Sequence, residues 1–157
     1  MKYYLRSMVP IDKEQIMSLL YKTSEFLPEE VLVAEEVIDA YLECPFRDYF
    51  IEVATVDATV VGYICYGKTP LTKSSWEVYW LAVLKEHQGF GIGKALLRFS
   101  EEDIVNRGGK LMLIETSSKT NYLNTRRFYR HNGFRRIARI VDFYDQEDHL
   151  ILFEKRF

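Results

Sequence analysis

The stretch "EHQGFGIGKALL", residues 86–97, carries three glycines at alternate positions directly before a run with helical spacing. A glycine inside a helix costs about 0.8–1.0 kcal/mol relative to alanine, so glycines at a helix start are costly unless the backbone must be left bare. Successive backbone amides at the positive end of a helix form an anion cradle, and missing Cβ atoms let phosphate oxygens approach. The stretch therefore predicts a phosphate-binding loop, with a tight turn that binds no ligand as the alternative.

Only one of three phosphate-binding patterns fits these glycines. The P-loop pattern G-x-x-x-x-G-K-[ST] fails, because counting back from Gly93 its first position is Gln88 and its last is Ala95. The dinucleotide pattern G-x-G-x-x-G fails, because no register places its third glycine on a glycine. The pattern Q-x-x-G-x-G is matched by Gln88, Gly91 and Gly93.

The composition sets the broad class of the protein. With 157 residues the chain fits one domain, and we expect a single domain over residues 1–157. Its residues are 48% hydrophobic and 28% charged, which is typical of a globular protein. No apolar run reaches the ~18 residues of a membrane span, and no secretion signal is visible at the N-terminus, so a cytoplasmic location is expected. The net charge of −2 argues against a general binder of nucleic acid or membranes.

Hydrophobic periodicity predicts seven strands and four helices in the order βααβββαβαββ, which is an α+β or mixed α/β class. The strands are expected at residues 2–8, 48–55, 59–67, 74–84, 110–116, 135–144 and 149–157. The first helix follows Asp12 and Gln15, which resemble a capping box. The other helices are expected at residues 28–42, 91–107 and 124–134.

Two motifs together resemble the GNAT superfamily of acetyl-CoA-dependent N-acetyltransferases. They are "WEVYWLAVLKEHQGFGIGKALL", residues 76–97, and "TRRFYRHNGF", residues 125–134. The order of elements is similar to that of the family over essentially the whole chain. The resemblance implies one GNAT-like domain, in which a central, mostly antiparallel, twisted sheet of about seven strands is flanked by about four helices. These motifs are specific to the superfamily but not to a substrate.

The resemblance implies acetyl-CoA as co-substrate and no metal ion. The pyrophosphate of coenzyme A would lie on the backbone of the glycine loop, and the pantetheine arm would pair with the preceding strand. The family's usual asparagine is replaced here by Tyr122, so Asn124 is expected to contact the pantetheine instead. The expected cofactor-binding residues are Leu81, Ala82, Val83, Gln88, Gly89, Phe90, Gly91, Ile92, Gly93, Lys94 and Asn124.

The resemblance also implies roles for three catalytic residues. Tyr129 occupies the position of the general acid that protonates the departing thiolate, and the backbone N–H of Val83 is the expected oxyanion donor. Glu77 lies where histone-type members place their general base. Glu115 lies on the strand that carries a glutamate in members that acetylate protein N-termini. The sequence leaves open whether Glu77, Glu115 or a water chain removes the proton from the amine.

Glu77 is narrowly preferred over Glu115 as the general base. Glu77 and Tyr79 are expected on one face of their strand, and Val78 and Trp80 on the other. If that face lies in the cleft, its apolar surroundings would raise the pKa of Glu77 into the range useful for a base.

The acceptor is predicted to be a primary amine, either a small amine or amino-acid-type metabolite or a protein N-terminus. The first two helices, which line the acceptor side in this family, carry acidic and aromatic residues: Phe26, Glu29, Glu30, Glu35, Glu36 and Tyr41. The turn at residues 142–149 resembles the tyrosine-bearing turn by which N-terminal acetyltransferases hold a peptide backbone. A non-catalytic acyl-CoA-binding or sensor module on the same fold is the alternative, and formation of a homodimer is left open.

One basic stretch stays without an assigned role. Between Thr116 and Val141 the chain has no acidic residue but carries Lys119, Arg126, Arg127, Arg130, Arg135, Arg136 and Arg139. These side chains are compatible with the ribose 3′-phosphate of coenzyme A, with an acidic partner, or with a merely solvated face. Binding of nucleic acid is the rival that would show a steep dependence on salt, and we do not expect it. The three histidines and two cysteines show no metal-ligand spacing.

Overall fold

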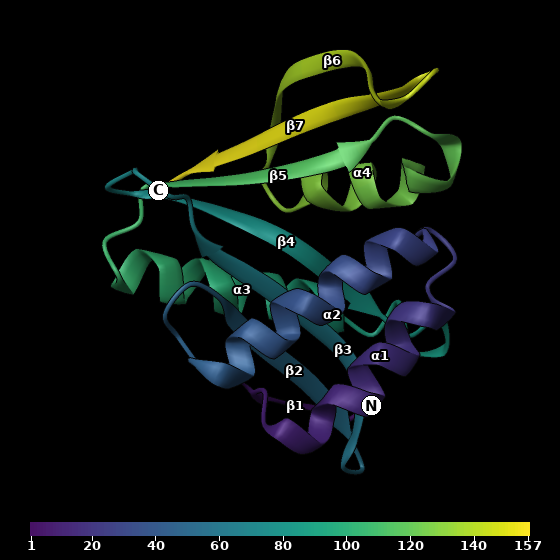
Figure 1. Ribbon diagram of the computed structural model, residues 1–157, viewed down its shortest axis with the longest axis vertical. Coiled ribbons are helices and arrows are strands. Elements are labelled where there is room, and N and C mark those ends of the chain that lie inside the picture. Colours follow the sequence, from purple (N-terminus) through teal and green to yellow (C-terminus); the bar gives the residue numbers. More distant parts are fainter.

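Seven strands form one twisted sheet in the computed structural model, which describes all residues from 1 to 157 (Figure 1). The strands are β1 (Tyr4–Ser7), β2 (Phe50–Val56), β3 (Thr59–Lys68), β4 (Ser75–Val83), β5 (Leu111–Ser117), β6 (Arg135–Asp145) and β7 (Asp148–Arg156). Their spatial order is β1-β2-β3-β4-β5-β7-β6. Every neighbouring pair is antiparallel except β4 and β5. The predicted class and the predicted order of elements are confirmed.

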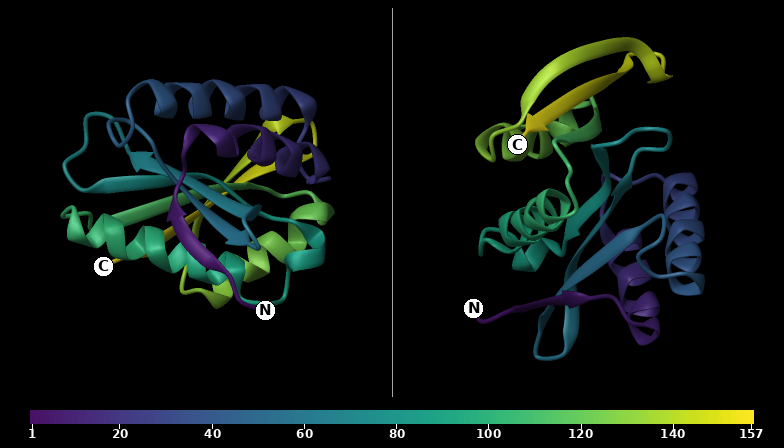
Figure 2. Two further views of the ribbon diagram at one scale, coloured as in Figure 1. Left: turned by 90° about the horizontal axis from the view of Figure 1, so that it is seen from below. Right: turned by 90° about the vertical axis from the view of Figure 1, so that its left-hand side faces the viewer.

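Helices cover both faces of the sheet, and each face has its own core (Figure 2). The helices are α1 (Lys13–Lys22), α2 (Pro28–Glu43), α3 (Ile92–Asn106) and α4 (Leu123–His131). Buried side chains of α1 and α2 pack on one face against β2 and β3. Buried side chains of α3, together with Tyr129 from α4, pack on the other face against the centre of the sheet. The apolar stripes of the helices therefore determine which face each helix covers.

The predicted capping box at the start of α1 is wrong. A 3₁₀ turn precedes the helix, and the Asp12 carboxylate accepts a hydrogen bond of 2.9 Å from the Val9 amide. Arg6 binds the same carboxylate through two hydrogen bonds of 2.6 and 2.8 Å. The Gln15 side chain accepts a hydrogen bond from the amide of Val60 on β3. The Asp12 side chain thus caps the preceding 3₁₀ turn and pairs with Arg6, and the Gln15 side chain makes a tertiary contact. The spacing of the two residues in the sequence reveals neither role.

The predicted alternation along β4 fails after Tyr79. The register between β3 and β4 shifts there, because Cys65 pairs with Trp80 whereas the next residue, Tyr66, pairs with Val78. The extra residue in β4 is a β-bulge, which returns the next side chain to the same face. Trp80 therefore packs with Tyr79 against the core under α1 and α2, and not with Val78 in the other core.

β4 and β5 separate beyond their first four residues. The two parallel strands pair only from Ser75–Leu111 to Val78–Ile114. β5 continues in its pairing with β7, while β4 continues in its pairing with β3. The second half of β4 thus has an unpaired edge, and an opening is left in the middle of the sheet.

Candidate active site

The opening between β4 and β5 leads into a cleft of about 410 Å³. Three elements build it: the end of β4, the glycine loop with the start of α3, and one face of α4. Its lining contains most of the residues expected to bind the cofactor, namely Leu81, Ala82, Val83, Gln88, Gly89, Gly91, Ile92, Gly93, Lys94 and Asn124. Phe90 is not part of the lining and is 52% exposed. The structure therefore brings together ten of the eleven predicted positions.

The glycine loop has the backbone geometry of an anion cradle. Gly89 and Gly91 have φ angles of 82° and 83°, in the left-handed region that side chains disfavour. Gly91 is the N-cap residue of α3, so the free amides of the first helical turn and the positive end of the helix dipole face the cleft. The Gln88 side chain donates a hydrogen bond of 3.0 Å to the carbonyl of Val83. This bond fixes the loop to the end of β4.

Glycine at position 93 keeps space free in the cleft, and no unusual backbone conformation requires it. It lies inside the first turn of α3, where its backbone is ordinary for any residue. A Cβ atom at this position would contact Phe128 at 3.6 Å and Val83 at 3.7 Å, and so would fill the space between the cradle and α4. The predicted pyrophosphate site thus fits the shape of the loop.

The free edge of β4 offers backbone amides to the cleft. The amide of Leu84 donates to Val61 on β3, and amides alternate in direction along an antiparallel strand. The amides of Leu81 and Val83 therefore point away from β3, toward the opening. This arrangement suits a ligand with its own amide groups, because such a ligand can pair with the strand edge.

Tyr129 lies at the inner end of the cleft, on α4. Its ring is 5% exposed and makes edge contacts with Phe128 and Phe134, with ring centroids 5.4 and 5.8 Å apart. Its hydroxyl forms no hydrogen bond within the chain, and burial raises the pKa of Tyr129 well above its ordinary value. The hydroxyl is thus protonated at neutral pH and free to donate to a ligand in the cleft.

Glu77 and Glu115 lie on one face of the sheet, beside the opening. Glu77 pairs in the parallel ladder with Leu113, two residues before Glu115, so both carboxylates point the same way. Neither forms an ion pair. Burial is the main cause that raises the pKa of Glu77, and the neighbouring Glu115 carboxylate raises it further. Glu115 is exposed. Of these two glutamates, Glu77 is therefore the one whose surroundings suit a general base.

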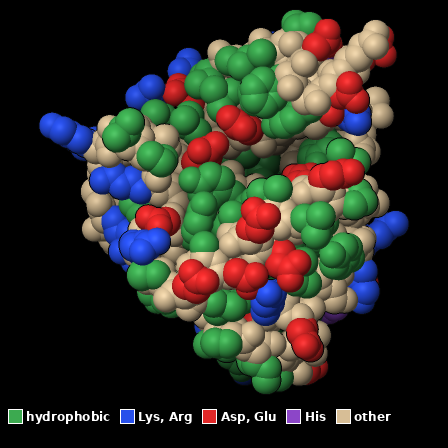
Figure 3. All heavy atoms as spheres, in the orientation of Figure 1, with side chains coloured by type: hydrophobic (Ala, Val, Ile, Leu, Met, Phe, Trp, Pro, Cys, Tyr) green, Lys and Arg blue, Asp and Glu red, His purple; other side chains and the backbone are tan.

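A hollow bordered by acidic side chains lies between the β5–β7–β6 part of the sheet and α2 (Figure 3). The carboxylates of Glu30, Glu77, Glu115 and Asp148 all raise the pKa of Tyr144, after the larger effect of burial. Asp148 is compensated by hydrogen bonding to Ser117 and by Lys119 at 3.5 Å. The remaining three glutamates have no cationic partner. We refer to Glu30, Glu77 and Glu115, around Tyr144, as the acidic cleft.

The structure adds lining residues that the motifs did not predict: Glu25, His87, Thr125 and Phe128. Tyr122, at the position of the family's asparagine, donates a hydrogen bond of 2.9 Å to the carbonyl of Glu25 and does not line the cleft. Only the regular spacing of Thr125 and Phe128 on the helix of Tyr129 could have indicated their place.

No three His, Cys, Asp or Glu side chains are grouped so that they could hold a metal ion. No helix combines the length and the apolar character that crossing a membrane requires.

Comparisons of the sequence and of the structure with known proteins point to the same family. The sequence profile described as acetyltransferase (GNAT) domain matches residues 47–136. The uncharacterized N-acetyltransferase MJ1530 of Methanocaldococcus jannaschii is 34% identical over 108 residues, which cover 66% of this chain and 65% of that relative, just under two thirds of its length. A GNAT-family protein from Desulfovibrio desulfuricans is 35% identical and superimposes with a TM-score of 0.95 over 99% of both chains. The PaiA N-acetyltransferase of Thermoplasma acidophilum, solved with coenzyme A, shares the fold over 100% of both chains, with a TM-score of 0.80 and 19% identity.

Proposed function

The chain belongs to the GNAT acetyltransferase family, and we propose that it transfers the acetyl group of acetyl-CoA to the primary amine of a cationic acceptor. The observation that carries this proposal is the meeting of two sites at one opening in the sheet. The glycine loop, with the shape to bind phosphates, lies on one side, and the acidic cleft lies on the other. The reacting groups would meet beside Tyr129 and Glu77, where β4 separates from β5.

The residues of the glycine loop and of β4 would hold acetyl-CoA, which supplies the activated acetyl thioester. The amides at the start of α3 would bind its pyrophosphate. The free amide of Leu81 would pair with the pantetheine arm, the Val83 amide would remain for the thioester carbonyl, and Asn124 lies within the same cleft. The solved relative from Thermoplasma acidophilum, which is in complex with coenzyme A, supports this choice of co-substrate.

The chain's own groups would then handle charge and protons. Glu77 accepts a proton from the acceptor ammonium, because only a neutral amine has the lone pair that attacks the carbonyl carbon. The Val83 amide donates a hydrogen bond to the carbonyl oxygen as negative charge develops on it. The C–N bond forms, the C–S bond breaks, and Tyr129 donates its proton to the departing sulfur. The attacking nitrogen then loses its second proton, which restores the Tyr129 hydroxyl, so that the products are a neutral amide and the free thiol.

The acidic cleft favours an acceptor with more than one positive charge, or with a charged amine beside a peptide backbone. Three unpaired carboxylates on α2, β4 and β5 would attract a cation and would pair with it once bound. Small polyamine-like or amino-acid-type amines meet this description, as does a protein N-terminus held near the β6–β7 turn.

An acceptor panel tests the proposed function. Release of free thiol from acetyl-CoA should depend on the added amine, and polyamines and dipeptides with free N-termini should be better acceptors than neutral or acidic amines. Tight binding of acetyl-CoA without amine-dependent release by any acceptor would instead favour a non-catalytic acyl-CoA-binding module.

Replacing Glu77 with glutamine should change the pH profile of the reaction. Because its pKa is raised, Glu77 ionises at a higher pH than an ordinary glutamate, so kcat/KM should rise with pH as this group loses its proton. In Glu77→Gln this rise of kcat/KM on the acidic side of the profile, the acidic limb, should disappear. At neutral pH kcat/KM should fall by about 10²-fold, which is the low end for acid–base catalysis, because Glu115 remains nearby. The rate should recover at high pH, where the amine loses its proton to water.

The matched control is Glu115→Gln, which should keep the acidic limb of the wild-type enzyme. If Glu115→Gln loses the limb and Glu77→Gln keeps it, the roles of the two glutamates are reversed. If both variants keep the wild-type profile, neither carboxylate is the base.

A further inference from the structure

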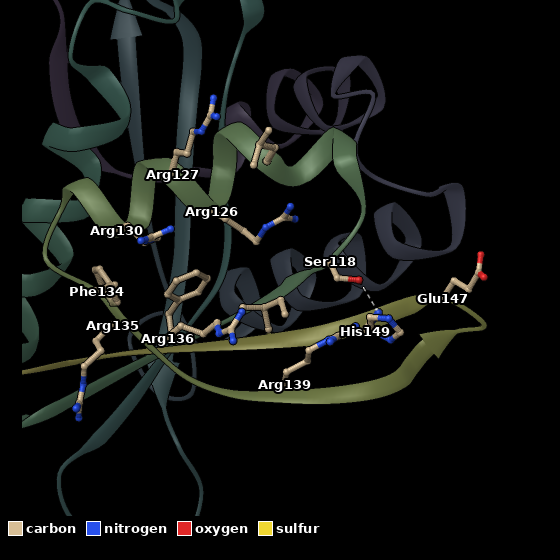
Figure 4. Close-up of a pocket in the computed structure, with 13 residues that line it drawn as sticks. Ser118, Arg126, Arg127, Arg130, Phe134, Arg135, Arg136, Arg139, Glu147 and His149 are labelled. Carbon is tan, nitrogen blue, oxygen red and sulfur yellow. Dashed lines mark hydrogen bonds between the residues drawn. The ribbon is translucent and has the colours of Figure 1, made fainter.

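A second concave surface lies on the far side of α4, between this helix and the β6–β7 hairpin (Figure 4). The groove has a volume of about 1000 Å³. Six arginines line it, three from α4 and three from β6, namely Arg126, Arg127, Arg130, Arg135, Arg136 and Arg139. We call this surface the arginine groove. It accounts for nearly all of the basic stretch that the function proposed above does not use.

The arginine groove is separate from the acetyl-CoA cleft, although both use α4. Asn124, Thr125, Phe128 and Tyr129 face the cleft. Arg126, Arg127 and Arg130 belong to the opposite lining, as the period of a helix requires. A ligand in the groove would therefore contact the same helix as acetyl-CoA, but on its other face.

Most of the guanidinium groups in the groove have no partner. Arg126 donates to the carbonyls of Ser117 and Lys119, at 2.7 and 2.8 Å. Arg135 forms an ion pair of 2.6 Å with Glu154, and in Figure 4 its side chain points away from the gap between α4 and the hairpin. The other four arginines form no side-chain hydrogen bond or ion pair within the chain.

The lining of the groove contains little negative charge that could neutralise these arginines. Glu147, at the tip of the hairpin, is the only acidic residue in the lining, and Figure 4 shows its carboxylate directed outward. The whole chain has a net charge of −2, so this concentration of positive charge is local. Like charges on neighbouring side chains repel one another, and an anion bound between them removes that repulsion.

The guanidinium groups and the volume of the groove suit the phosphate groups of a small molecule. Guanidinium groups bind phosphate oxygens through two parallel hydrogen bonds, which favours arginine where planar recognition is needed. Arg130 on α4 and Arg136 and Arg139 on β6 lie on the two sides of the gap (Figure 4), so more than one phosphate can be held. The volume is at the upper end of small-molecule sites. The aromatic rings in the lining, Phe134 and Phe153, are buried and offer no exposed face for stacking a nucleic-acid base.

We propose that the arginine groove is a binding site for a small molecule that carries at least two phosphate groups. The proposal rests on three unpartnered arginines around one concave surface, Arg130 from α4 and Arg136 and Arg139 from β6. It holds whether or not the acetyl-transfer function is correct. Free polyphosphate and the phosphate chain of a nucleotide share this chemistry, and titration with each distinguishes them.

Calorimetric titration with inorganic tripolyphosphate tests the site. The protein is first saturated with coenzyme A, so that the cradle at α3 does not contribute. We expect one binding event, weakened by about 10-fold or more for each guanidinium removed in Arg130→Gln and Arg136→Gln. The control is Arg98→Gln, which removes an exposed arginine of α3 outside both sites and should bind as the wild type does. All substituted arginines are exposed, so thermal unfolding of the variants should be unchanged.

A parallel titration with a nucleoside triphosphate identifies the source of the phosphates. Equal affinities for the nucleoside triphosphate and for tripolyphosphate support recognition of the phosphate chain alone. A higher affinity for the nucleoside triphosphate, which is lost in the same variants, supports a nucleotide as the ligand. No binding of either probe overturns the proposal, as does binding that both arginine variants retain. Binding of a single-stranded oligonucleotide without binding of tripolyphosphate overturns it in favour of a nucleic-acid surface.

Discussion

Gly93→Asp is expected to abolish acetyl-CoA binding and to leave the fold intact. A carboxylate at this position would stand among the amides that are proposed to hold the pyrophosphate, and would repel it. The same carboxylate suits the first turn of α3, because negative charge stabilises the positive end of a helix by about 0.3–1 kcal/mol. Thermal unfolding with coenzyme A measures the effect: a ligand at about 100 times its Kd stabilises the wild type by about 2.7 kcal/mol, and the variant should show no shift.

Gly93→Asn is the matched control, since it adds the same volume without the charge. Weaker binding by Gly93→Asp than by Gly93→Asn shows that the cradle holds an anion. Unchanged coenzyme A binding by both variants would contradict the assignment of the cradle. Gly91 is less suitable for this test, because its φ angle of 83° would strain any side chain and lower stability by itself.

Tyr129→Phe should lower kcat by about 10²–10⁴-fold, the range of general acid catalysis. The substitution removes one hydroxyl and keeps the ring, so the contacts with Phe128 and Phe134 remain. Since the proton is needed only as the sulfur departs, the loss should appear in kcat rather than in the affinity for acetyl-CoA. Steady-state kinetics together with a binding titration separate the two quantities.

Tyr66→Phe serves as a control for the loss of a buried hydroxyl. The Tyr66 hydroxyl donates to Asp103 at 2.8 Å, away from the cleft, so this variant should lose stability and keep kcat. If Tyr129→Phe raises KM and leaves kcat unchanged, Tyr129 shapes the cleft but is not the acid.

The sequence predicted the parts of the fold that depend on local pattern. Strand periodicity and helical spacing were sufficient to predict the order of elements, and the glycines at 89, 91 and 93 indicated a phosphate-binding loop. The other residues around the cleft were predicted from the resemblance of two motifs to the GNAT superfamily. These features are local because a helix N-terminus and the preceding strand are adjacent in the chain. Predictions of this kind need no knowledge of tertiary contacts.

The parts that depend on distant contacts were not predictable. The bulge that moves Trp80 to the face of Tyr79 arises from the register with β3, and a single strand carries no signal for it. The acidic cleft forms only when the sheet brings Glu30 and Glu115 to Tyr144. The arginines were visible in the sequence, but their arrangement around one groove depends on how α4 packs against β6.

Transfer of an isotopically labelled acetyl group tests the central claim most directly. The protein is incubated with labelled acetyl-CoA and a cationic amine, and the products are identified by mass spectrometry. The account predicts that N-acetylated amine carrying the label appears in equal amount to free coenzyme A, and that Tyr129→Phe slows both together. Release of coenzyme A without labelled amine, or no release with any amine despite tight acetyl-CoA binding, would contradict it.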